Sequence, residues 1–312
     1  MSHVKPALSD WLLLIFLTLI WGFSYYFIKH SLHGFNPTQV ASLRMIFSAV
    51  VLLPFLGRAY KMIPRTSYPF ILLVGVIGSL LPAYLYPFAQ QRISSSVAGI
   101  VNAFTPICTY GIGIYLFSVS KEKEKIAGSL IALIGAICLI LFRPNASLHA
   151  ESLYLLIAFT VPFLYGFNGN IIKSKLSGIP GIPMTAAMYV STLIFCIPIA
   201  IASGAFQQIP IAIQQGPAFY HLLALSILGS ALAMTLFNIL IQRVHVLFAA
   251  SVTYLMPLVS MFIGWLDGEH LLWNDVLGLI FILIGVMTIN GAIHFFKKKK
   301  AGSRLDGPGL TS

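Results

Sequence analysis

Basic residues are confined almost entirely to alternate gaps between ten hydrophobic stretches of this 312-residue chain. Each stretch has about 17–24 residues, which is enough to cross a hydrocarbon core of about 30 Å as an α-helix. The sequence therefore predicts an all-α membrane protein with ten transmembrane helices. The stretches are residues 10–29, 37–57, 68–90, 95–118, 126–142, 152–172, 184–203, 218–241, 247–266 and 274–295.

The positions of Lys and Arg also predict the orientation of these helices. When both termini are assigned to the cytoplasm, fifteen of the 19 basic residues fall in cytoplasmic segments. Only Lys29, Arg92 and Arg143 fall on the opposite side, and Arg44 lies inside the second stretch. Because basic residues are enriched in cytoplasmic loops, we expect both termini in the cytoplasm and residues 297–312 to form a basic cytoplasmic tail.

Composition agrees with the membrane class. The mean hydropathy is +0.90, and only 9% of residues are charged, against about 25% in soluble domains. The net charge of +11 is spread over cytoplasmic loops and the tail. This pattern predicts attraction to anionic lipid at that face and no nucleic-acid partner.

The N-terminus and the cysteines bear on processing and metal binding. Lys5 and the apolar run after it are compatible with a signal peptide, but the run continues to Lys29 without a small-x-small cleavage site. We therefore expect the first stretch to be retained, in a bacterial inner membrane. Cys108, Cys138 and Cys196 lie inside the stretches, which predicts packing and neither a disulfide framework nor a metal site.

The chain repeats itself. Residues 78–92, GSLLPAYLYPFAQQR, match residues 229–243, GSALAMTLFNILIQR, with Gly-Ser opening and Gln-Arg closing both segments. Similar offsets relate Pro106 to Pro257, Gly128 and Gly135 to Gly278 and Gly285, and residues 21–29 to residues 165–173. The matches predict two repeats of five helices, at residues 10–143 and 151–296. Because five is odd, the second repeat enters the membrane in the opposite orientation.

An inverted repeat has a functional consequence. Two similar halves of opposite orientation can exchange conformations, which gives alternating access around a substrate site near the membrane midplane. Asn102 and Thr253 each lie four residues before a repeat-related proline, and a proline leaves the carbonyl four residues back without its helical donor. We expect interrupted helices at Pro106 and Pro257 that contribute to such a site.

Several of these residues form a recognisable set: Trp21-Gly22-x-Ser24-Tyr25, Ser42-Leu43-Arg44, Ala98 with Thr105-Pro106, Pro257, Gly268-Glu269, and Gly278 with Gly285. With them the chain resembles the drug/metabolite transporter superfamily, specifically its ten-span EamA family. It departs from the family pattern after the fourth stretch, where Ser118–Glu122 replace a Gly-Glu element. The resemblance implies export or exchange of small metabolites such as amino acids, with no catalysis and no cofactor.

Polar and aromatic residues inside the stretches are the candidate substrate ligands. Arg44 is about seven residues inside the second stretch, where its guanidinium either meets a substrate carboxylate or phosphate or serves structure by reaching the interface or backbone carbonyls. The amides and hydroxyls can likewise bind substrate or link helices. The full predicted set is Trp21, Ser24, Tyr25, Arg44, Tyr84, Asn102, Thr105, Asn168, Asn238, Thr253 and Tyr254.

The acidic residues argue against a proton relay inside the membrane. All eight lie in loops or at the ends of stretches, whereas proton-driven carriers commonly keep an ionisable group at membrane depth. Facilitated flux or exchange is therefore favoured. Coupling through a histidine or a loop acid is left open, as are the substrate and the choice between monomer and homodimer.

Other functions have less support. An intramembrane enzyme needs a Ser-Lys or Ser-His pair, two aspartates or an H-E-x-x-H helix, and a channel needs a filter loop or a ring of charges. None of these patterns is present. Transport of phosphorylated or sugar-linked solutes is the main alternative, but it predicts more than one buried basic residue.

Overall fold

The computed structural model describes residues 6–141, 148–244, 246–268 and 273–289, and these residues form helices joined by short connections. Within them, eight helical segments are long and apolar enough to cross a membrane. They correspond to eight of the ten predicted stretches: Leu8–Ser31, Pro37–Met62, Arg65–Ala89, Ser95–Leu116, Leu153–Lys175, Gly181–Ala202, Ala218–Arg243 and Val246–Leu266. A polytopic helical architecture is therefore confirmed.

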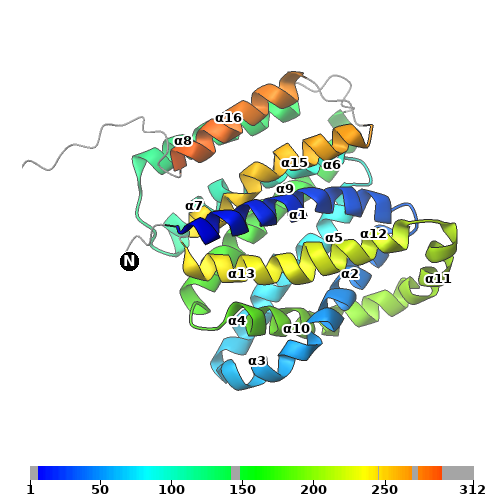
Figure 1. Ribbon diagram of the computed structural model, residues 1–312. Coiled ribbons are helices and arrows are strands. Elements are labelled where there is room, and N and C mark those ends of the chain that lie inside the picture. The colour runs from blue at the N-terminus through cyan, green and yellow to red at the C-terminus, as the bar shows by residue number, and fades with distance from the viewer. Residues whose placement is uncertain (1–5, 142–147, 245, 269–272, 290–312) are drawn as a thin grey trace, which may run out of the picture.

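The other two stretches correspond to α8 (Lys123–Leu141) and α16 (Trp273–Ile289), which lie side by side along one flank of the molecule (Figure 1). A Cβ on Gly135 would lie 2.6 Å from the Gly278 carbonyl oxygen, and one on Gly285 would lie 2.5 Å from that of Gly128. Glycine thus permits close helix packing here. Both helices end where the described residues end, so ten spans remain a prediction.

Some predicted features lie outside the described residues. These are Lys5, Arg143, Glu269 and the basic tail at residues 297–312. The predicted orientation of the two termini is likewise not tested by the structure.

Several spans combine shorter helices. The second contains α2 (Pro37–Leu52), a 3-10 turn (Leu53–Phe55) and α3 (Leu56–Met62). The sixth and seventh spans are single helices, α9 (Leu148–Lys175) and α10 (Gly181–Ala202). The helix α11 (Ala205–Gln215) follows α10 along the chain. Polar caps set some boundaries: Asn36 Oδ1 accepts from the Gln39 backbone N–H at the start of α2, at 2.9 Å.

The third and eighth spans each contain a π-helical segment. The third comprises a 3-10 turn (Arg65–Ser67), α4 (Tyr68–Gly75), the π-helix η3 (Val76–Leu80) and α5 (Leu81–Ala89). The eighth comprises α12 (Ala218–Ala224), the π-helix η4 (Leu225–Leu232) and α13 (Ala233–Arg243). The Gly-Ser pairs of the two matching sequence segments lie inside η3 and η4. Because π-segments are rare and often occur at functional sites, these two positions are of interest.

The fourth and ninth spans are both interrupted, but not at equivalent places. α6 (Ser95–Asn102) ends just before α7 (Thr105–Leu116), in which Pro106 occupies the first turn. α14 (Val246–Ala250) ends at Ser251, and Pro257 lies inside α15 (Val252–Leu266). The expectation of a break at Pro257 is wrong. Ser251 Oγ and Thr253 Oγ1 donate to carbonyls of the preceding turn, at 2.6 and 2.8 Å, and such side-chain bonds compete with the helical ladder.

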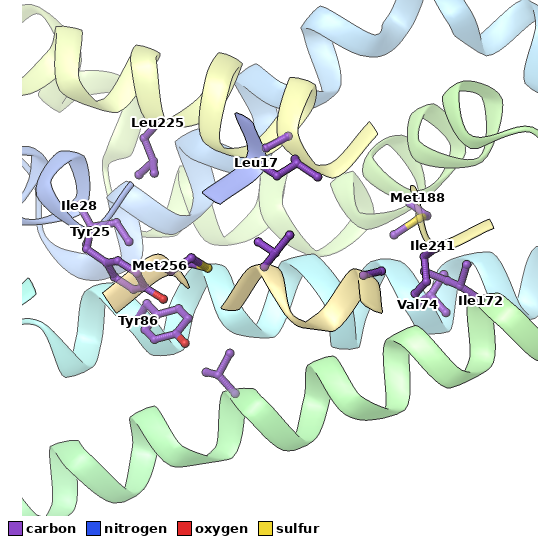
Figure 2. Packing of buried hydrophobic residues seen from close by; sticks show 14 of the residues in the cluster. Leu17, Tyr25, Ile28, Val74, Tyr86, Ile172, Met188, Leu225, Ile241 and Met256 are labelled. Carbon is purple, nitrogen blue, oxygen red and sulfur yellow. The ribbon is translucent and has the colours of Figure 1, made fainter. Parts of the chain in front are cut away.

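In the interior, α1 (Leu8–Ser31) packs against α13 and α15, and α9 packs against α13. Figure 2 shows buried side chains of this region, including Leu17 on α1, Ile172 on α9 and Met256 on α15. Large apolar side chains also cover the outside; Ile194, for example, is 70% exposed. An apolar exterior of this extent fits a surface that faces lipid.

Candidate functional site

A cavity of about 720 Å³, counted with the space at its mouth, lies among α1, α2, α5, α6, α7, α9, α13, α14 and α15. We call it the central cavity. Its lining residues are Trp21, Ser24, Tyr25, Ile28, Arg44, Tyr86, Asn102, Thr105, Thr109, Tyr165, Asn168, Gly169, Met234, Phe237, Ile241, Val246, Ala250, Thr253 and Met256.

Most of the predicted ligands converge on this cavity. The members of the set that line it are Trp21, Ser24, Tyr25, Arg44, Asn102, Thr105, Asn168 and Thr253. They come from five spans, the first, second, fourth, sixth and ninth, and the fold brings them together. That they bind a substrate remains a prediction.

Three predicted ligands do not line the cavity. The Tyr84 hydroxyl lies 2.7 Å from Ser42 Oγ, and Asn238 Nδ2 donates to Thr185 Oγ1 at 2.9 Å, which joins α13 to α10. Tyr254 is fully buried in a separate apolar cluster. The contacts of Tyr84 and Asn238 fit the alternative role of polar side chains in joining helices, and substrate binding by any of the three stays a prediction.

Some cavity residues were not predicted. Thr109 lies one helical turn after Thr105, so the helical period could have indicated it. Tyr165 occupies the repeat position that matches Trp21. The apolar members, such as Met234 and Phe237, carry no distinguishing signal because most residues of these helices are apolar.

One face of α1 supplies the aromatic wall of the cavity. Trp21, Ser24, Tyr25 and Ile28 follow the spacing that puts residues on one side of a helix. Trp21 Nε1 donates to the Gly229 carbonyl oxygen at 2.9 Å, so α1 is held against η4. The rings of Tyr25 and Tyr86 meet edge to face, with centroids 5.4 Å apart (Figure 2). The wall is thus held by contacts to η4 and α5 and is largely aromatic.

The amides of the cavity differ in how far their hydrogen bonds are satisfied. Asn102 Oδ1 accepts from Thr105 Oγ1 at 3.0 Å. Asn168 Oδ1 is buried, and no described residue donates to it. Because buried polar atoms are normally paired, this oxygen makes Asn168 a candidate ligand, and the same carboxamide packs against Gly78.

Arg44 lies between the central cavity and a smaller one. Its Nε donates to Ser230 Oγ at 2.5 Å, which joins α2 to η4. The second cavity has about 300 Å³ of empty space and lies between the two π-helices. Arg44 is the single charged residue among the described residues that line either cavity. The second cavity is lined by Trp21, Arg44, Met45, Gly78, Ser79, Pro82, Ala83, Tyr165, Tyr189, Gly229 and Met234.

One end of the bundle carries an ion pair. Lys29 Nζ lies 2.6 Å from Asp267 Oδ2, and His30 Nε2 lies 2.9 Å from Asp267 Oδ1. Burial by itself would raise the pKa of Asp267, but the hydrogen bonds and positive charge of Lys29 and His30 outweigh it and hold that pKa below its ordinary value. We call these three residues the Asp267 cluster. It joins the end of α1 to the residue after α15.

Lys173, the repeat counterpart of Lys29, makes a different contact. Its Nζ donates to the carbonyl oxygens of Ile241, Gln242 and Val244, at 3.2, 3.2 and 2.8 Å. These are the last carbonyls of α13 and the residue after it, where a cation is favourable. The two ends of the bundle therefore differ in their contacts. Among the described residues, an ion pair joins α1 to the residue after α15 at the Lys29 end, whereas Lys173 at the other end binds backbone carbonyls.

Comparisons with known proteins agree on the class. The chain is 25% identical over 286 residues to "Uncharacterized inner membrane transporter YedA" of Escherichia coli strain K12, covering 91% of each protein. It is 25% identical to a "Probable amino-acid metabolite efflux pump" of Salmonella typhimurium, covering 89% of this chain and 93% of that protein.

Two further comparisons concern a relative named for its solutes and a solved structure. The chain is 27% identical to an "S-adenosylmethionine/S-adenosylhomocysteine transporter" of Chlamydia trachomatis, covering 84% of this chain and 83% of that protein. A solved crystal structure superposes with a TM-score of 0.65 at 17% identity, covering 91% of this chain and 96% of its own, which shows a shared fold.

The family model described as "EamA-like transporter family" matches residues 9–141 and 152–291. Those two matched segments correspond closely to the two halves that the internal repeat delimits. Because the match covers most of the sequence, the chain belongs to the EamA-like transporter family and is a multi-pass membrane protein.

Proposed function

We propose that the protein is a secondary transporter that exports or exchanges small organic metabolites, amino acids or related compounds, by alternating access around the central cavity. The observation that carries this proposal is the cavity itself, where eight intramembrane residues from distant parts of the chain meet. Its lining of aromatic rings, amides and hydroxyls suits a small amphipathic solute.

Paired contacts support two inverted repeats of five spans, residues 10–143 and 151–296. A Cβ on Gly229 would lie 2.5 Å from Ser24 Oγ, and a Cβ on Gly78 would collide with the Asn168 carboxamide. Gly78 and Gly229 match in sequence, as do Ser24 and Asn168. Each half thus presses its first helix against the π-helix of the other half. Such reciprocity is what alternating access by exchange of conformations requires.

The helices α8 and α16 make contacts that are reciprocal in the same way. Gly128 packs against Gly285, and Gly135 packs against Gly278, while sequence relates Gly128 to Gly278 and Gly135 to Gly285. A two-fold operation that exchanges the halves would map one contact onto the other. This supports ten spans in two inverted repeats, and the distribution of the basic residues supports cytoplasmic termini.

The substrate class rests on the cavity's charge and on the relatives. Proteins with similar sequences carry names that refer to amino-acid metabolites and to S-adenosylmethionine. The alternative, phosphorylated or sugar-linked solutes, predicts several buried basic residues, whereas Arg44 is the single one lining the described cavities. We therefore favour amino-acid-like metabolites, carried across a bacterial inner membrane whose anionic lipids contact the basic cytoplasmic face.

Counterflow in proteoliposomes tests the proposal. Liposomes preloaded with one unlabelled amino acid should accumulate the labelled form transiently, and protein-free liposomes should not. Asn168→Ala removes the unpaired acceptor, so we expect the half-saturating concentration to rise about tenfold, the size of one buried hydrogen bond. Gln214→Ala, an exposed amide on α11, is the matched control and should behave as wild type.

Two results would contradict the proposal. One is absence of counterflow for amino acids, phosphorylated solutes and sugar-linked solutes alike, with folded protein verified by gel filtration. The other is counterflow that Asn168→Ala leaves unchanged, which would move the substrate site away from this cavity.

A further inference from the structure

The guanidinium of Arg44 makes fewer hydrogen bonds than its donors allow. An arginine side chain has five N–H donors, and the structure gives Arg44 a single hydrogen bond, from Nε to Ser230 Oγ. No described acid pairs with it, and it donates to no described backbone carbonyl. A charge at membrane depth is costly and ordinarily faces a polar partner or a cavity. An arginine with a purely structural role would be expected to use more of its donors.

The space beside Arg44 contains a second unsatisfied polar group. Ser79 lies in η3 beside the side chain of Tyr189, and its Oγ is buried and makes no hydrogen bond of regular geometry to a described residue. Ser79 and Ser230 are repeat-related residues on the two π-helices, and the second cavity lies between them. Arg44 borders both this cavity and the central one. The donors of Arg44 and the Ser79 hydroxyl are therefore available to one ligand group.

We propose that Arg44 and Ser79 form a subsite for a single carboxylate of the transported solute, while the remainder of the solute occupies the central cavity. The subsite deepens the proposed function and rests on it. A guanidinium fork matches the two oxygens of a carboxylate, and its charge balances one negative charge. A phosphate monoester carries about 1.5 to 2 negative charges at neutral pH, and no second cation lines the described cavities to balance the excess.

The site offers a charged partner to a solute's carboxylate but none to its amino group. No Asp or Glu among the described residues lines either cavity, so an amino group would meet neutral acceptors such as Asn168 Oδ1 and the Thr253 hydroxyl, and the faces of aromatic rings such as Trp21. The carboxylate is therefore required for tight binding, and the amino group is dispensable. N-acetylation of a substrate should be tolerated better than amidation of its carboxylate.

A direct binding measurement separates this subsite from transport. Trp21 lines both cavities, whereas the other three tryptophans, Trp11, Trp265 and Trp273, are exposed and can be replaced by phenylalanine. Fluorescence of Trp21 in purified full-length protein then reports binding. The probes are the free acid, the carboxamide and the N-acetyl derivative of L-methionine and of L-phenylalanine.

We expect the free acid to bind at least about tenfold more tightly than its amide, with the N-acetyl derivative close to the acid. Arg44→Gln should reduce the acid-to-amide ratio to below about threefold, and Arg44→Lys should restore part of it. Arg92→Gln, at an exposed loop position, should leave the ratio unchanged. Ser79→Ala should lower the acid-to-amide ratio about two- to fivefold. This variant still tests the subsite if the Arg44 variants do not fold.

Three outcomes would overturn the subsite. The first is equal binding of acid and amide by the protein that keeps Trp21 and Arg44. The second is an equal loss of affinity for acid and amide in Arg44→Gln, and the third is no binding of any free acid. A carboxylate preference in binding without counterflow in liposomes would leave the subsite standing and remove the proposed transport function instead.

Discussion

Replacing Asp267 by asparagine is expected to shift the transporter about tenfold toward the state that is open at the Lys29 end. The substitution removes the charge that Lys29 Nζ contacts at 2.6 Å and that His30 contacts at 2.9 Å. Because the pair links α1 of the first half to the residue after α15 of the second, we expect it to break when this end opens. About 1.4 kcal/mol of lost coupling corresponds to a tenfold change.

The shift can be measured with a cysteine in the central cavity. Thr105→Cys, in a chain whose three cysteines are replaced by alanine, should react with a membrane-impermeant maleimide about tenfold faster from the Lys29 side when Asp267→Asn is added. Exchanging the charges, with Lys29→Asp and Asp267→Lys together, should return the rate toward its original value.

A second ion pair provides the matched control. Lys125 Nζ contacts Glu122 Oε1 at 2.5 Å, and both residues belong to the first half. Glu122→Gln should not change the labelling rate, because that pair does not cross between the halves. An equal effect of Glu122→Gln and Asp267→Asn would contradict the role we assign to the Asp267 cluster.

The same ion pair predicts a limited pH dependence. The Asp267 pKa is held below its ordinary value in this conformation, so the carboxylate stabilises the closed end fully above the ordinary aspartate range, about pH 4. That stabilisation is lost only as the pH falls through the lowered pKa. Titration of Asp267 itself should therefore leave the labelling rate unchanged between pH 5 and 8.

Adding one methyl group at Gly229 is expected to reduce transport at least about tenfold. The Cβ of Gly229→Ala would lie 2.5 Å from Ser24 Oγ, and Trp21 donates to the carbonyl of the same residue. The methyl group must push α1 away from η4, where the halves meet beside Arg44. Gly111→Ala, where an added Cβ meets no atom within 4 Å, should transport normally.

A suppressor distinguishes this clash from general damage. Ser24→Ala removes the hydroxyl that the new methyl group meets, so the double variant Gly229→Ala, Ser24→Ala should recover most of the activity lost in the single variant. Recovery indicates that the fit between α1 and η4 sets the rate, as non-additive effects of contacting residues do. A double variant as impaired as Gly229→Ala alone would indicate that glycine is needed for the π-helix itself.

Much of the architecture was predictable because a bilayer demands long apolar helices with cytoplasmic positive charge. The repeat in residues 78–92 and 229–243 located both π-helices, although nothing in sequence indicated their π geometry. Pro106 correctly marked a break, but Pro257 did not, because Ser251 and Thr253 end the helix earlier. Local hydroxyl bonds of this kind are not visible in a proline pattern.

Residues of the candidate site were predictable where a polar side chain stands in an otherwise apolar helix. Arg44 and Asn168 stand out as polar residues in apolar helices, and both line the central cavity. Asn238 and Tyr254 stood out equally, but they face neighbouring helices. Which way a polar side chain points depends on helix packing, and a single sequence does not encode that in any local pattern.

Two-sided labelling of Thr105→Cys tests the central claim, that one cavity opens alternately to either side. In right-side-out and in inverted membrane vesicles the cysteine should react with the impermeant maleimide from both sides, and a transported amino acid should slow both reactions. Labelling from one side alone, or labelling that no transported solute slows, would contradict alternating access around this cavity.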